Sequence, residues 1–172
     1  EKAQPLQPDN TQQVLERLTA PARRQEGTSP VEAWRQLEAI CEEGFGFVRD
    51  GVRLQKAYEQ IRALRASLEN MAAPGPCEYN LEWINSVLVR NLALCAEIGI
   101  RSALDRKESR GCHLRMDEPQ VDNEHYLFSW QASLKEGEPV YEKAVPKGTY
   151  LPLDTRNYPS VLDCIADTIL GG

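Results

Sequence analysis

Apolar residues recur at helical spacing in three stretches of the first 110 residues. The first stretch follows Ser29 and Pro30, where Ser29 can cap a helix, Pro30 needs no amide partner, and Glu32 completes a capping box. Its apolar residues are Val31, Trp34, Leu37, Cys41, Phe45 and Val48, at spacings of three or four. This spacing predicts an amphipathic helix, and Gly44 and Gly46 predict its exit or a close backbone approach near its end.

Two further helices are predicted beyond Asp50, which is a good N-cap residue. The stripe of the next helix is Leu54, Tyr58, Ile61, Leu64 or Arg65, Leu68 and Met71, and the prolines of segment 73–76 end it. The last helix is predicted from about Asn80 to Lys107, with a buried face of Leu81, Ile84, Leu88, Leu92 or Asn91, Cys95, Ile98 and Ser102. Three such helices with short connections predict an antiparallel three-helix bundle over residues 30–110, held mainly by packing.

The segments on either side of the bundle lack this periodicity. Residues 1–29 are predicted to be a poorly organised lead-in, because prolines interrupt them and only Thr11–Leu18 is suited to a short helix. Residues 111–172 are predicted to form an extended, partly irregular tail with a short β-hairpin around 136–138 and a last short helix over 161–170. A tail of this length needs a surface to lie on, either the bundle or a missing domain. The predicted fold class is therefore mainly α.

Charge and cysteine content narrow the functional classes. The formal net charge is −6, which argues against general nucleic-acid binding. No apolar run approaches the roughly 20 residues of a membrane span and no signal peptide is visible, so direct membrane insertion is not expected. The five cysteines form no C-x-x-C pair and stand at no zinc-ligand spacing to the two histidines, which favours a reduced, cytoplasmic location. The chain begins at Glu1 without an initiator Met, as expected of an excised piece or a processed product.

Charged residues gather at 106–119, where the third predicted helix ends. Arg110 and Arg115 can make forked contacts with carboxylates, including those of Glu108 and Asp117. Gly111 allows a left-handed helix exit, and Pro119 prevents the helix from resuming. This density of complementary charge indicates a structural network, or a loop that docks on a neighbouring domain or subunit. Catalysis by His113 or an arginine would need a substrate pocket, which an isolated bundle does not obviously offer.

Two other hypotheses come from different functional classes. The chain can be a stand-alone helical interaction module that uses residues 120–172 as a partner-binding arm. It can also be a small metal or thiol enzyme that uses Cys112 and His113. The second idea is the weaker, because adjacent residues in an extended segment point to opposite sides and make a poor catalytic pair.

Segment 106–119, Arg-Lys-Glu-Ser-Arg-Gly-Cys-His-Leu-Arg-Met-Asp-Glu-Pro, resembles the R-x-E-S-R-G-A-H-x-R-x-D-x-P signature of the FAD-dependent fumarate reductase and succinate dehydrogenase flavoproteins. Segments 42–49, 91–97 and 101–107 are also similar to that family, and the resemblance covers roughly residues 30–130. Cys112 replaces the usual Ala, Glu118 replaces a common Tyr, and Tyr126 stands near the place of a Trp. These departures fit a divergent fumarate reductase-like branch, and L-aspartate oxidase and adenylylsulfate reductase flavoproteins have related C-terminal regions.

The resemblance implies the C-terminal helical domain of a parent enzyme that moves a hydride between FAD and a dicarboxylate. The chain has no G-x-G-x-x-G, so FAD is expected in the parent only, and no catalytic, cofactor-binding or metal residue is expected here. The chain is therefore not expected to be catalytic by itself. The resemblance assigns a docking role to Glu108, Ser109, Arg110, Gly111, His113, Arg115 and Asp117. Its implied partners are the FAD-binding and capping domains of the same polypeptide and an iron–sulfur subunit, with partner subunits tying it to the cytoplasmic face of a membrane.

Overall fold

The structure is a computed structural model of the 172-residue chain, and it describes residues 8–145. Its helices are α1 (Pro8–Arg23), α2 (Pro30–Gly44), α3 (Gly51–Ser67), the 3-10 helix η1 (Leu68–Asn70), α4 (Leu81–Asp105) and α5 (Asn123–Tyr126). Its strands are β1 (Val48–Arg49), β2 (Leu114–Arg115), β3 (Ser129–Lys135) and β4 (Glu138–Ala144). The predicted mainly helical class is confirmed. The helix predicted over 161–170 lies outside the described residues.

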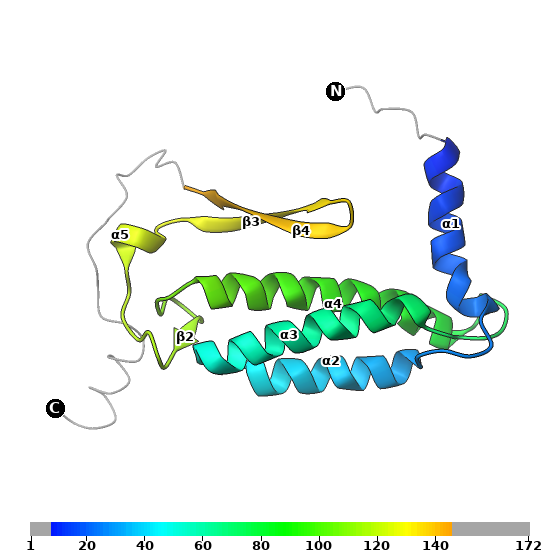
Figure 1. Ribbon diagram of the computed structural model, residues 1–172, viewed down its shortest axis with the longest axis horizontal. Helices are drawn as coiled ribbons and strands as arrows, with labels where there is room; N and C mark the ends of the chain where they lie inside the picture. The colour runs from blue at the N-terminus through cyan, green and yellow to red at the C-terminus, as the bar shows by residue number, and fades with distance from the viewer. Residues whose placement is uncertain (1–7, 146–172) are drawn as a thin grey trace. The chain divides into compact units, whose positions relative to one another are not determined.

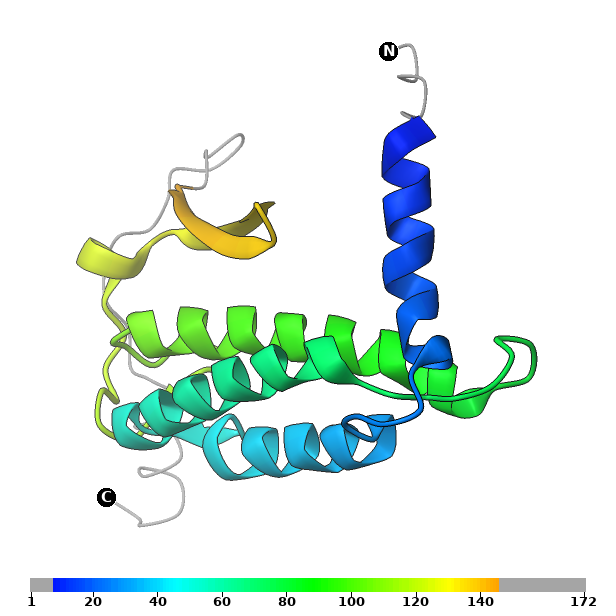
Figure 2. The same ribbon diagram turned by 45° about the vertical axis from the view of Figure 1, so that its right-hand side comes forward.

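The chain divides into two compact units, and α2, α3 and α4 each contribute to both. One unit comprises Glu1–Ala39 and Gln60–Cys95, and the other comprises Ile40–Glu59 and Ala96–Gly172. Within each unit the segments of α2, α3 and α4 lie side by side, and α3 runs antiparallel to the other two (Figure 1, Figure 2). This arrangement confirms the predicted antiparallel bundle. None of the helices within 8–145 is long and apolar enough to cross a membrane.

Short polar side chains precede α2, α3 and α4. The amide of Glu32 approaches Ser29 Oγ at 3.5 Å, that of Arg53 donates to Asp50 Oδ1 at 2.9 Å, and that of Trp83 donates to Asn80 Oδ1 at 3.0 Å. Each contact satisfies an amide that has no partner inside its helix. The predicted stripe of α3 and η1 supplies much of the core, with Leu54, Ile61, Leu64, Leu68 and Met71 all buried.

The end of α2 approaches the start of α3 closely. A Cβ atom added at Gly44 would lie 2.5 Å from the Cβ of Ala57, which is closer than real side chains come. The glycine therefore lets the two helices pack backbone against backbone at this point. The close approach predicted from the glycines near the end of this helix is confirmed at Gly44.

The buried face predicted for α4 is wrong. Leu81 is 72% exposed, and Ile84, Leu88 and Leu92 are each more than 40% exposed. Cys95 is exposed as well. The helix instead buries Ser86, Val89, Ala93, Glu97, Ile100 and Ala103. Three of these six residues, Ser86, Ala93 and Ala103, have small side chains that let neighbouring helices approach, whereas a search for large apolar residues selects the opposite face.

The prediction of a poorly organised lead-in is also wrong for much of its length. Helix α1 spans 16 residues, Pro8–Arg23, and is twice as long as the predicted short helix over 11–18. The indole Nε1 of Trp83 donates to the carbonyl of Leu18 at 2.7 Å, and Pro21 and Ala22 are buried. A tertiary contact from α4 therefore organises a segment whose own sequence pattern is weak.

The hairpin predicted around 136–138 is confirmed and is longer than expected. Strands β3 and β4 have seven residues each and pair antiparallel, from Ser129 opposite Ala144 to Lys135 opposite Glu138. Glu136 and Gly137 form the turn with φ of 54° and 86°, as a two-residue turn of type I′ requires. The second sheet is a parallel pair of two-residue strands, in which β1 joins β2 through Val48 with Leu114 and Arg49 with Arg115.

Candidate functional site

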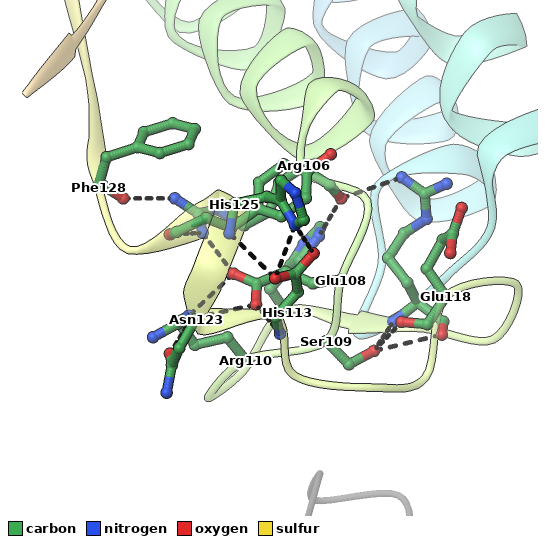
Figure 3. A network of polar contacts seen from close by, with 12 residues as sticks. Arg106, Glu108, Ser109, Arg110, His113, Glu118, Asn123, His125 and Phe128 are labelled. Carbon is green, nitrogen blue, oxygen red and sulfur yellow. Dashed lines mark hydrogen bonds and ion pairs between the residues drawn. The ribbon is translucent and has the colours of Figure 1, made fainter. Parts of the chain in front are cut away.

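The signature loop, residues 106–119, leaves the end of α4 and leads toward α5. Its polar side chains point toward one another and toward the flanking backbone (Figure 3). All seven residues singled out in the sequence lie in this loop. The structure joins six of them, all except Gly111, in one hydrogen-bonded network together with Arg49, Arg106 and Asn123. Every contact described below lies within a single compact unit.

The Glu108 carboxylate is the centre of the network, and its side chain is fully buried. Arg110 donates to it through Nε at 2.8 Å and Nη2 at 3.1 Å, and the amide of Asp122 donates at 2.8 Å. Arg106 Nη1 donates to the same carboxylate (Figure 3). Burial alone would raise the pKa of Glu108, but hydrogen bonds from Arg110, from the Asp122 amide and from Arg106 outweigh it and lower that pKa. Glu108 is therefore a charged anchor whose oxygens are occupied by this chain.

Arg106 connects Glu108 to the end of α5 and to the segment that follows it. Its Nη1 donates to the carbonyl of Tyr126 at 2.8 Å, its Nη2 donates to that of Phe128 at 2.6 Å, and its guanidinium lies 5.0 Å from the centre of the Phe128 ring. Sequence reasoning did not select Arg106, because the third helix was predicted to continue to Lys107. The helix ends at Asp105, so Arg106 is the first residue of the loop. Its place at the start of the signature was the signal that could have identified it.

Arg115 and Asp117 connect the end of α4 to the start of α3. Arg115 contacts both oxygens of Asp117, each at 2.7 Å, and this forked contact was predicted. The remaining donor, Nη1, faces the carbonyls of Ala103, Leu104 and Arg106 at 3.2–3.3 Å, where α4 ends. Asp117 Oδ2 also accepts the amide of Gly51, the first residue of α3, at 2.9 Å. A cation at one helix C-terminus and an anion at another N-terminus both complement the helix dipoles.

Asp117 is expected to make the domain less stable in acid. The hydrogen bonds from Arg115 are the main reason that the pKa of Asp117 falls from 3.8 to about 2. A carboxyl whose pKa is lower in the folded state stabilises the protein above its unfolded pKa, and that stabilisation is lost as the pH falls from about 4 through 2. Because the side chain is 40% exposed, the effect is discounted to about 1 kcal/mol.

The measurement is urea unfolding of the wild type and of Asp117→Asn between pH 7 and pH 2. The variant is expected to be less stable at pH 7 and to show a smaller loss of stability between pH 4 and pH 2. If the free energy of unfolding changes with pH in the same way for the two proteins, the pKa of Asp117 is not lowered in the folded state.

His113 is held between two arginines. Its Nδ1 lies 3.0 Å from Arg49 Nη1, and its Nε2 lies 3.1 Å from the carbonyl oxygen of Arg106. A carbonyl only accepts, so Nε2 carries the hydrogen and Nδ1 accepts from Arg49. Burial lowers the pKa of His113, and the neighbouring positive charges of Arg49, Arg115 and Arg106 lower it further. The ring is thus a neutral structural link with both nitrogens engaged, and this geometry does not suit the donation of a proton to a substrate.

Ser109 and Gly111 shape the turn of the loop. Ser109 Oγ accepts the amide of Arg115 at 2.8 Å and donates to the carbonyl of Glu118 at 2.9 Å. Arg110 and His113 exchange two backbone hydrogen bonds of 2.9 Å each, which encloses Gly111 and Cys112 in a two-residue turn. Gly111 has a φ of 54° in this turn, which confirms its left-handed conformation. The helix exit predicted for it is wrong, because α4 already ends at Asp105.

Gly111→Ala is expected to lower the free energy of unfolding by about 1 kcal/mol, because an L-residue is strained at positive φ. A Cβ atom at this position meets nothing within 4 Å, so backbone strain is the whole effect. Gly111→Asn is the matched control, since Asn tolerates this conformation better than Ala does. Urea unfolding of the two variants tests the assignment, and an equal loss for Ala and Asn would contradict it.

No group of three or more His, Cys, Asp or Glu residues in the described part of the chain is arranged to hold a metal ion. Cys112 is exposed, whereas the nitrogens of His113 contact Arg49 and Arg106. The structure therefore does not bring Cys112 and His113 together as a catalytic pair.

Comparison with known proteins identifies the family of this chain. A family model described as "Fumarate reductase flavoprotein C-term" matches residues 34–158. The fumarate reductase flavoprotein subunit of Haemophilus influenzae is 31% identical over 153 residues, which are 86% of this chain and 24% of that protein. The L-aspartate oxidase of Pseudomonas aeruginosa is 35% identical over 88 residues, which are 51% of this chain and 15% of that protein. The chain thus spans a quarter or less of the length of these two relatives.

Solved structures share the fold. The Mycobacterium smegmatis Sdh1 complex in the apo form matches with a TM-score of 0.79 and 20% identity, over 96% of this chain and 28% of that one. A quinol-fumarate reductase matches with a TM-score of 0.76 and 24% identity, over 84% of this chain and 26% of that one. With a family match across most of the sequence, the chain belongs to the fumarate reductase flavoprotein C-terminal family, as a domain that accounts for only part of its relatives' length.

Proposed function

We propose that this chain is the structural and docking C-terminal domain of a flavoprotein subunit of the fumarate reductase or succinate dehydrogenase type, and that it has no activity by itself. The supporting observation is the family match over residues 34–158, combined with a chain that covers only 24% of the Haemophilus influenzae subunit. The parent enzyme would transfer a hydride between FAD and a dicarboxylate. That chemistry would belong to the parts of the polypeptide outside this chain.

We do not expect the described residues to form a dinucleotide-fold site for FAD. A dinucleotide fold places its pyrophosphate at the N-terminus of the helix that follows a strand. Here β1 leads into α3, but the Asp117 carboxylate already accepts the amide of Gly51 at that N-terminus. The sequence also lacks the glycine fingerprint that such a site needs. No step of the reaction is therefore assigned to this chain.

The proposed role of the signature loop is to fix the shape of the domain where it meets its neighbours. The functional groups of Glu108, Arg115 and His113 turn inward and bind other parts of the loop, the Arg49 side chain or the end of α4. Cys112 and Met116 face outward, and Met116 is 60% exposed. In this proposal the outer surface of the loop meets the FAD-binding or capping domain of the same polypeptide, or an iron–sulfur subunit. Those partners would hold the domain at the cytoplasmic face of a membrane.

Two measurements test the proposal. In the first, the purified chain is titrated with FAD and assayed with fumarate and a reduced dye, and neither saturable flavin binding nor turnover is expected. In the second, the reading frame upstream of residue 1 is sequenced in the source genome, where a flavin-binding body is expected. Saturable FAD binding or turnover by the chain, or a start codon at residue 1, would contradict the proposal. A start codon there would favour a stand-alone helical interaction module.

A further inference from the structure

The exposed side of α4 carries a row of large aliphatic side chains. Leu81, Ile84, Leu88 and Leu92 are 72%, 41%, 44% and 41% exposed, and Cys95 continues the row. Their spacings of three or four residues place them on one face of the helix. We name this face, residues 81, 84, 88, 92 and 95, the α4 stripe. It lies within one compact unit and comes from the longest helix among the described residues.

A shallow hollow in the same unit lies beside the stripe. Its volume is about 300 Å³, and its walls are Val31, Trp34, Arg35, Glu38 and Asn85. Asn85 follows Ile84 directly and lies one turn before Leu88, so the hollow borders the stripe along α4. The Trp34 indole donates to Glu38 at 2.8 Å, which satisfies its polar edge and leaves its ring as an apolar wall. The stripe and the hollow together are suited to bind a partner whose surface is apolar and carries one side chain that projects into the hollow.

We propose that the α4 stripe is the surface through which this domain packs on the remainder of its own flavoprotein polypeptide. The inference rests on the proposed function, because it needs a parent chain. The relatives are several times longer than this chain, and the match covers 15% and 24% of the two described above. The remainder of such a polypeptide is the occupant to which the inference commits.

The size of the stripe favours a tethered occupant over a separate molecule. Its four aliphatic side chains are each only partly exposed, so together they offer much less than the roughly 800 Å² per partner that a stable interface between separate proteins needs. A domain of the same polypeptide avoids most of the entropy of association, since its effective concentration is about millimolar through a short linker. Two copies of this chain would also each bring a net charge of −6. A small apolar stripe is therefore sufficient inside one polypeptide and insufficient for a dimer.

Cys95 provides a reporter within the stripe. In the isolated chain its exposed thiol is expected to react readily with a maleimide. In the whole polypeptide we expect the labelling rate of Cys95 to fall at least tenfold, as measured by mass spectrometry of its peptide. Ile84→Lys with Leu88→Lys in the whole polypeptide is expected to restore the rate to within twofold of the isolated chain. Val52→Lys, at an 82% exposed position of α3, is the matched control and is expected to leave Cys95 protected.

The outcomes separate this inference from the proposed function. A whole polypeptide that binds FAD and turns over while Cys95 reacts at the rate of the isolated chain overturns the docking surface and leaves the proposed function standing. A reading frame without a flavin-binding body overturns both. Sedimentation showing that the isolated chain dimerises, and that the double Lys variant is a monomer, would assign the stripe to a second copy and overturn the inference. Circular dichroism of the isolated variants must match the wild type, as expected for exposed positions.

Discussion

Glu108→Gln is expected to lower the free energy of unfolding by about 3 kcal/mol, the largest effect of any single change considered. Gln keeps the shape of the side chain but removes the charge that pairs with Arg106 and Arg110 in a site where Glu108 itself is fully buried. Two guanidinium groups would then lack their counter-charge, and the amide of Asp122 would face a weaker acceptor. Urea unfolding at pH 7 measures the loss.

The matched control for that variant is Glu124→Gln, at an exposed position in the neighbouring helix α5. It is expected to change stability by less than about 0.5 kcal/mol. A double-mutant cycle with Arg110→Met adds a second check, because Arg110→Met should be less harmful once Glu108 is already Gln. Additive losses, or a loss below 1 kcal/mol for Glu108→Gln, would show that Glu108 is not the centre of a coupled network.

Arg115→Lys is expected to lower the free energy of unfolding by about 2 kcal/mol, although both side chains carry a positive charge. Lys cannot contact both Asp117 oxygens in a planar fork and face the carbonyls at the end of α4 at the same time. The Arg115 side chain is only 3% exposed, so water does not replace the lost donors. Thermal and urea unfolding of the variant measure this loss.

Arg53→Lys is a close control for Arg115→Lys. Arg53 also pairs with an aspartate, at 3.2 Å from Asp50, but its side chain is 64% exposed. The same chemical change at Arg53 should therefore have an effect below about 0.5 kcal/mol. Equal losses at the two positions would mean that the forked, buried geometry of Arg115 contributes nothing beyond its charge.

Local signals in the sequence predicted much of this fold. Ser29 and Asp50 stand at the starts of their helices, and the stripe of α3 faces the core. The pairing of Arg110 with Glu108 and of Arg115 with Asp117 followed from charge complementarity over two residues. These features depend on residues close together in the chain, and this is why a single sequence contains enough information for them.

Contacts between distant segments could not be predicted in the same way. Arg49 lies 64 residues from His113, and Trp83 lies 65 residues from Leu18, so neither contact has a local sequence signal.

The wrong prediction of the buried face of α4 has a different cause. Periodicity located the apolar side of that helix correctly, but the bundle buries its small residues, such as Ala93 and Ala103, and leaves Leu81 and Leu88 outside. Periodicity identifies an apolar face and does not say which neighbour covers it.

The long separations in the signature network have a kinetic consequence. Arg49 with His113 and Gly51 with Asp117 close loops of more than sixty residues, so these contacts form only after α3 and α4 have paired. Interactions that form late contribute little to the folding transition state and act mainly on the rate of unfolding. The network is therefore expected to slow the unfolding of the domain. Substitutions that weaken it should raise the rate of unfolding and leave the rate of refolding nearly constant.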